Sequence, residues 1–198
     1  MTTSDPHVED LYAEEIVPQG ETASRFKLSP FMVVIAVAVL LLLVVAGWGI
    51  YRNSLDTRTS GEAPNFSITT YEGDKFILSE YRGEAVVVIN VWQSNCPPCH
   101  DEAPMLVRVW EEYRNKGVIF VGVNAKDPDY VATDYIAQYG ITYPNGLDVG
   151  DRIQDEYRTT GYPETFIIDR NGKIQRHFAG PPSEATLRAE IDRVLDMG

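Results

Sequence analysis

The hydrophobic pattern divides the chain into an apolar segment near the N-terminus and a longer region of mixed patterning. Residues 31–51 form a run of 21 positions without a charged side chain. As a helix, this run is about 31 Å long, which matches the roughly 30 Å hydrocarbon core of a bilayer. It has no polar face, unlike a helix packed on a soluble core, and it exceeds the apolar core of a typical signal peptide. We predict a single transmembrane anchor over residues 31–51.

The segments on either side of this anchor are polar. Residues 1–30 are acidic and weakly patterned, which predicts a disordered tail. Residues 52–62 are short and polar, so we predict a linker there, followed by one domain over residues 63–198. Basic residues lie at both ends of the anchor, so the positive-inside rule leaves the orientation nearly undecided.

The pattern of the domain predicts both strands and hairpins. Residues 85–92 and 118–124 are continuous apolar runs rich in β-branched residues, as strands buried on both faces are. Glu72, Gly73 and Asp74 mark the turn of an N-terminal hairpin, and residues 170–173 mark the turn of a second one. Two buried strands and two hairpins predict a sheet at the centre of the domain.

Helical patterns alternate with these strands. They cover residues 99–117, 128–140 and 183–198. Asp127 and Ser183 are predicted N-caps, Gly140 a predicted C-terminal stop, and Pro104 a predicted kink. A strand–helix–strand unit followed by a hairpin and a helix predicts an α/β domain with helices on both faces of a mixed sheet.

Charge and composition narrow the function classes. The formal net charge is −12, and an acidic domain repels phosphate backbones, so no nucleic-acid partner is expected. The chain has two cysteines and three histidines, one of them on the far side of the anchor, so a four-ligand zinc site within one chain is not expected. We expect no metal and no other cofactor.

The two cysteines stand together in the sequence Cys96-Pro97-Pro98-Cys99-His100. This pattern fits covalent attachment of a c-type haem, and it also fits a thiol–disulfide pair. Between a strand and a helix, Cys96 lies where open N–H groups and the helix dipole favour a thiolate. Cys99, one turn further on, can then attack a mixed disulfide formed on Cys96.

The haem interpretation needs more than this motif. His100 would have to ligate the iron, and Met105 lies too close along the same helix to reach the opposite face of the haem. We therefore expect His100 to be a solvated helix residue. A haem-bearing electron carrier stays the alternative from a different class of protein.

Two longer stretches resemble a known family. Residues 90–104, NVWQSNCPPCHDEAP, and residues 161–174, GYPETFIIDRNGKI, are similar to the membrane-anchored thioredoxin-like oxidoreductases of cytochrome c biogenesis, the CcmG/DsbE, ResA and TlpA group. The resemblance covers about residues 63–195. It implies a thioredoxin-like fold with an N-terminal hairpin extension, on the extracytoplasmic side of the cell membrane with the N-terminus in the cytoplasm.

The resemblance also implies an activity and partners. It implies a thiol–disulfide oxidoreductase that reduces the disulfide in the C-x-x-C-H motif of apocytochrome c and is re-reduced by a transmembrane thiol carrier of the CcdA or DsbD type. The direction of electron flow depends on the residues between the cysteines, and Pro97-Pro98 is an unusual pair. Residues 63–66, APNF, are similar to peroxiredoxins as well, so a thiol peroxidase is the enzymatic alternative.

Catalytic roles follow from the resemblance residue by residue. Cys96 matches the attacking cysteine and Cys99 the resolving one, and the two form the redox-active disulfide. Pro163 matches a cis-proline opposite the cysteines. Glu164 and Glu102 match acidic residues of the group, and we expect either carboxylate to manage the proton of the resolving thiol, with Glu164 within reach of the cysteines.

Client binding is implied at four further positions. The backbone of Tyr162, before the proline, would pair with an extended client by strand addition. Pro97 and Pro98 lie between the cysteines, and Trp92 is expected beside them, more as a shield than as an anchor.

Overall fold

A computed structural model describes residues 29–53 and 57–197. The chain divides into two compact units, Met1–Ile50 and Tyr51–Gly198. The tail predicted for residues 1–30 lies almost wholly outside the described residues, as does part of the predicted linker.

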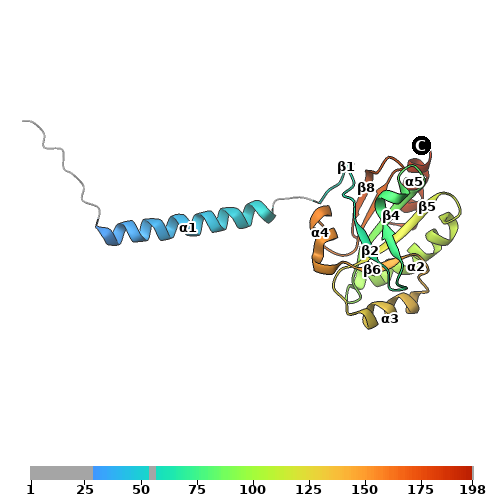
Figure 1. The fold of residues 1–198 in the computed structure, drawn as a ribbon, viewed down its shortest axis with the longest axis horizontal. Helices are drawn as coiled ribbons and strands as arrows, with labels where there is room; N and C mark the ends of the chain where they lie inside the picture. Colours follow the sequence, from blue (N-terminus) through green and yellow to red (C-terminus); the bar gives the residue numbers. More distant parts are fainter. Residues whose placement is uncertain (1–28, 54–56, 198) are drawn as a thin grey trace, which may run out of the picture. The chain divides into compact units, whose positions relative to one another are not determined.

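Helix α1 (Pro30–Asn53) contains the whole apolar run and extends it at both ends (Figure 1). Its residues 31–49 are exposed along the helix, as the side chains of a helix surrounded by lipid would be. By length and composition, α1 is a candidate membrane span. This agrees with the anchor that the hydrophobic pattern predicts.

The second unit is built on the predicted mixed sheet. Its six strands lie in the order β1-β8-β7-β4-β5-β6, in which β4, β5 and β6 are parallel and β7, β8 and β1 antiparallel. The strands are β1 (Gly61–Glu62), β4 (Val86–Trp92), β5 (Val118–Asn124), β6 (Asn145–Leu147), β7 (Glu164–Ile168) and β8 (Lys173–Ala179). Strand β1 pairs with β8, so the ordered sheet begins two residues before the predicted domain boundary.

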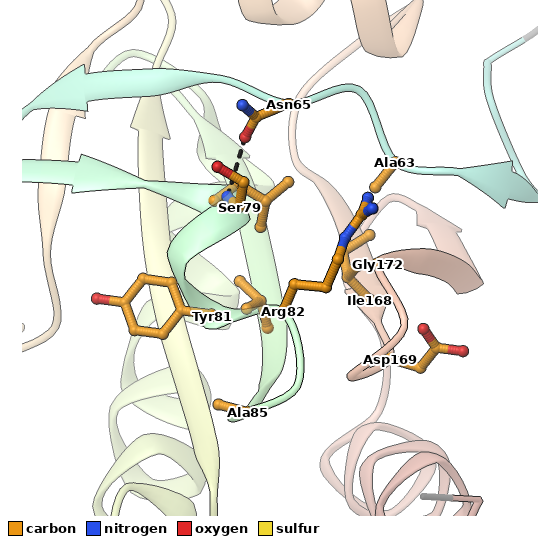
Figure 2. Close-up of a pocket in the computed structure, with 11 residues that line it drawn as sticks. Ala63, Asn65, Ser79, Tyr81, Arg82, Ala85, Ile168, Asp169 and Gly172 are labelled. Carbon is orange, nitrogen blue, oxygen red and sulfur yellow. Dashed lines mark hydrogen bonds between the residues drawn. The ribbon is translucent and has the colours of Figure 1, made fainter.

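The predicted N-terminal hairpin forms a separate two-stranded sheet. It consists of β2 (Ser67–Thr69) and β3 (Lys75–Ile77), followed by the 3-10 helix η1 (Leu78–Tyr81). A small pocket separates η1 from the β7–β8 turn, and the Ser79 N–H donates to Asn65 Oδ1 in its wall (Figure 2). None of the candidate site residues lines this pocket, so it has no part in the thiol chemistry.

Helices and the hairpin cover the two faces of the sheet. One face packs against α2 (Pro97–Tyr113), α3 (Asp129–Tyr139) and α5 (Glu184–Leu195) (Figure 1). The other packs against the hairpin and the short helix α4 (Arg152–Tyr157), which follows the 3-10 helix η2 (Val149–Asp151). Alternate side chains of strands β4, β5 and β7 point into opposite layers. Two neighbouring residues of a strand therefore face different layers.

The helix ends agree with the sequence in most places. Ser183 Oγ accepts from the Thr186 N–H, and Gly140 ends α3 in the left-handed region at φ 63°. Asp127 does not cap α3, because its carboxylate is bound to other groups and Pro128 holds the N-cap position. Pro104 lies within an uninterrupted α2.

Candidate active site

Cys96 stands at the junction between the loop after β4 and the start of α2. A disulfide joins it to Cys99, with 5.3 Å between the Cα atoms. Cys96 is the N-cap of α2, and its Sγ accepts from the Cys99 N–H at 3.2 Å. Pro97 and Pro98 occupy the first positions of the helix, where their missing N–H groups leave no hydrogen bond unmade. The fold thus places the Cys96 sulfur at the N-terminus of α2, where the Cys99 N–H and the helix dipole stabilise an anion.

The two sulfurs differ in access. Cys96 is 7% exposed and Cys99 is fully buried, while Pro97 is exposed beside them. A client disulfide can therefore reach Cys96 first, with Cys99 held behind it.

Pro163 lies directly before β7, the strand that pairs with β4, and the cysteine loop follows β4. The Tyr162–Pro163 peptide bond is cis, in agreement with the resemblance. Glu164 pairs with Val91 in the antiparallel ladder, so Pro163 lies level with the end of β4, from which the chain turns into the cysteine loop. Among the described residues, neither backbone group of Tyr162 has a hydrogen-bond partner. An extended client segment can use both groups.

Glu102 is the acid on the cysteine side of the sheet. It lies one turn after Cys99 on α2 and is 3% exposed. Its Oε1 accepts from Asn90 Nδ2 at 2.7 Å, and its buried Oε2 has no partner among the described residues. Burial raises the pKa of Glu102 to about 7, although the hydrogen bond from Asn90 lowers it. A group with this pKa can gain and lose a proton near neutral pH.

Glu164 does not lie where we expected it. In β7, Thr165 faces α2 and hydrogen-bonds with Asn90, so the preceding Glu164 faces the opposite layer. Its Oε1 accepts from the N–H groups of Thr160 and Gly161, at 2.7 and 3.0 Å. Its Oε2 lies 2.8 Å from Nε2 of His177. The expectation that Glu164 reaches the cysteines is wrong, because adjacency to Pro163 did not account for strand alternation.

The buried environment of Glu164 indicates a structural role. Burial on its own raises the pKa of this carboxyl, but hydrogen bonds from His177, Thr160 and Gly161 outweigh it and hold the pKa below its usual range. The charged carboxylate therefore fastens the loop that carries Tyr162 and Pro163.

Trp92 is not available to a client. It is 2% exposed, its indole N–H donates to Asn145 Oδ1 at 2.9 Å, and its ring stacks on Tyr135 with centroids 4.3 Å apart. It belongs to the same hydrophobic cluster as both cysteines. This corrects the assignment of Trp92 to client binding and agrees with a shield.

His100 is not the solvated residue that we expected. Its Nδ1 lies 2.6 Å from the Tyr139 hydroxyl, and its Nε2 lies 2.6 Å from the backbone oxygen of Ser94. Both ring nitrogens are engaged, so ligation of a haem iron would break one of these contacts.

Sequence reasoning missed Ser94 and gave Asp127 a different role. The Asp127 carboxylate accepts from the N–H and the hydroxyl of Ser94, at 2.6 and 2.7 Å. These residues lie 33 positions apart in sequence, and no local pattern links them. Only the parallel pairing of β4 with β5 brings the two loops together.

Comparison with known proteins agrees with this geometry. Residues 59–177, more than half of the chain, match the AhpC/TSA family. The thiol-disulfide oxidoreductase ResA of Halalkalibacterium halodurans is 32% identical over 152 residues, 74% of this chain and 86% of that protein. ResA of Geobacillus kaustophilus is 30% identical over 166 residues, 81% of this chain and 95% of that protein.

A solved structure supports the fold independently. The thiol:disulfide interchange protein DsbE of Chlorobium tepidum superimposes with a TM-score of 0.65 at 27% identity, over 71% of this chain and 99% of that one. The disulfide Cys96–Cys99 stands at a helix N-terminus opposite a cis-proline in the same thioredoxin-like fold. The chain belongs to the AhpC/TSA family and is a thiol-disulfide oxidoreductase of the ResA/DsbE type.

Proposed function

We propose that this protein reduces the disulfide in the C-x-x-C-H motif of apocytochrome c. The observation that carries the proposal is the unequal access of the two sulfurs, since Cys96 is slightly exposed and Cys99 is buried. The backbone groups of Tyr162, which have no hydrogen-bond partner within the part of the chain that the structure describes, support it. Such a site accepts an extended segment of an unfolded client, and apocytochrome c before haem attachment is such a client.

The reaction begins from the reduced protein. The Cys96 thiolate attacks one sulfur of the client disulfide, so that a Cys96–client bond forms and the client S–S bond breaks. The released client thiolate takes up a proton from water. Cys99 then loses its proton and attacks Cys96 Sγ, which forms the Cys96–Cys99 disulfide and releases the second client thiolate. Two electrons pass from the dithiol to the client.

Glu102 takes the proton from Cys99 in this scheme. It is buried on the same helix, one turn away, and a pKa of about 7 lets it accept a proton at neutral pH. Glu164 is not proposed for this step, because its carboxylate is bound on the other face of the sheet.

Client binding uses the backbone of Tyr162 and the rim formed by Pro97 and Pro98. Pro97 is exposed and Pro98 half-buried, so both can contact a segment that pairs with Tyr162. Helix α1 anchors the protein, with its N-terminus in the cytoplasm and the oxidoreductase domain outside. A transmembrane thiol carrier of the CcdA or DsbD type returns the disulfide to the dithiol.

A trapping experiment tests the client. In Cys99→Ser, the mixed disulfide on Cys96 cannot be resolved and should accumulate. The full chain in detergent is mixed with an oxidised apocytochrome c peptide that contains C-x-x-C-H, and with a control peptide whose disulfide is set in an unrelated sequence. Faster trapping of the first peptide supports the proposal. Equal trapping rates for the two peptides would contradict the proposal that apocytochrome c is the client. Rapid consumption of hydrogen peroxide by the wild type would favour the peroxidase alternative.

A further inference from the structure

Ser94, two residues before Cys96, is held by two side chains, the buried Asp127 and the half-buried His100. Its N–H and its hydroxyl both donate to the carboxylate of Asp127. Its carbonyl oxygen lies 2.6 Å from Nε2 of His100. Every polar group of this residue is thus bound to the loop after β5 or to α2, although Ser94 itself lies in a turn outside the helices and strands.

Asp127 is fixed in turn by the end of β5. It is 6% exposed, and Oδ2 accepts from Asn124 Nδ2 at 2.6 Å. The Asp127 N–H donates back to Asn124 Oδ1 at 2.9 Å. Because these two bonds to Asn124 hold the carboxylate in place, Asp127 anchors the Ser94 loop.

Both ring nitrogens of His100 are also held by hydrogen bonds. Because the Ser94 carbonyl can only accept, Nε2 must carry a proton. In the neutral ring Nδ1 is then an acceptor, and the Tyr139 hydroxyl donates to it at 2.6 Å. The ring also packs edge-on against Tyr135, with centroids 5.0 Å apart. Tyr139 and Tyr135 both belong to α3, so this helix supports the imidazole from outside.

We propose that Asp127 and His100 are positioning residues of the thiol chemistry, which hold the Ser94 loop so that the Cys96 sulfur stays over the N-terminus of α2. In the oxidised protein the bond to Cys99 already fixes Cys96. After reduction that bond is gone, and the clamp on Ser94 is what keeps the thiolate beside the Cys99 N–H. The inference rests on the thiol–disulfide activity and not on the identity of the client.

His100→Phe and Asp127→Asn, each in the full chain in detergent, test this. His100→Phe keeps an aromatic ring and removes both hydrogen bonds, and Asp127→Asn replaces an acceptor with a group that cannot serve all three donors. In both variants we expect Cys96 to alkylate about tenfold more slowly at a pH below its pKa. At a pH above that pKa, we also expect the glutathione equilibrium to shift about tenfold toward the disulfide, which is about 30 mV. Tyr130→Phe, at a tyrosine of the same helix that is 71% exposed, should change neither value.

The pair of variants separates positioning from simple electrostatics. Loss of a carboxylate near the sulfur would by itself favour the thiolate, so an electrostatic effect predicts faster alkylation in Asp127→Asn. Faster alkylation in that variant overturns the proposal. So does a lower melting temperature with unchanged alkylation and potential, which would indicate a purely structural role. Should either variant fail to fold, Tyr139→Phe removes only the support of Nδ1 and should slow alkylation by a smaller factor, about threefold. An unchanged rate in that variant also overturns the proposal.

Discussion

Replacement of Glu102 by Gln should change how the stability of the domain depends on pH. The substitution keeps the size of the side chain and its acceptor for Asn90, and it removes the ionisable proton. In the folded protein, burial raises the pKa of Glu102 from 4.5 to about 7. The unfolded chain should titrate near the ordinary value.

The sign and size follow from this difference. Between the two pKa values the folded protein holds a proton that the unfolded chain has released, so stability is highest at low pH and falls as pH rises. At about 1.4 kcal/mol per pH unit, the full loss is roughly 3 kcal/mol, complete above about pH 8. About 2.5 kcal/mol of it falls between pH 5 and pH 8. Glu102→Gln should lack this component.

Urea denaturation of the oxidised protein at pH 5 and pH 8 measures the effect. The free energy of unfolding of the wild type should drop by about 2 to 3 kcal/mol more than that of Glu102→Gln over this interval. Glu72→Gln, at an exposed glutamate in the hairpin turn, is the matched control and should follow the wild type. Parallel profiles for wild type and Glu102→Gln would show that folding does not raise the pKa of Glu102, and its carboxylate would then be too weak a base to take the proton of Cys99.

Three other results are expected. Glu164→Gln should lower the free energy of unfolding by about 2 to 4 kcal/mol, because two N–H groups, one hydroxyl and His177 lose their bonds to a buried charged carboxylate. The alkylation rate of Cys96 should stay unchanged. An unchanged urea midpoint would show that the carboxylate does not stabilise the loop. In the reduced protein Cys96 should alkylate far faster than Cys99, as measured by mass spectrometry of the labelled peptides, and a faster Cys99 would reverse the assigned roles. A membrane-impermeant maleimide added to intact, mildly reduced cells should label Cys96, and labelling only after lysis would place the domain in the cytoplasm.

The long apolar patterns predicted most of the fold. Strands β4 and β5 and both hairpins follow from runs of β-branched residues and from turn residues, because burial on both faces leaves a clear signal. Strand β6 and helix α4 have three and six residues, too few for a period to show. Their existence depends on pairing with β5 and on contacts with the hairpin layer, neither of which is local in sequence.

The sequence predicted the site residues that lie close together in the chain. It did not predict the positions of residues that depend on how the strands pair. Cys96 caps the helix that contains Cys99 and Glu102, so their spacing alone places the three residues together. The direction of Glu164 depends on which face of β7 meets α2, and that is set by pairing with Val91. Asp127 resembled a helix cap because the sequence shows only its neighbours in the chain. It does not show the Ser94 loop, which follows the adjacent parallel strand β4.

The direction of electron flow is the central claim, and the redox potential of the Cys96–Cys99 couple tests it most directly. The full chain in detergent is equilibrated with defined ratios of reduced and oxidised thiol, and the fraction of disulfide is measured after acid quench and alkylation. A reductase of client disulfides requires a potential on the order of −250 mV, near the value of about −270 mV for thioredoxin. A potential near about −120 mV, typical of a strong oxidant of protein thiols, would contradict the account.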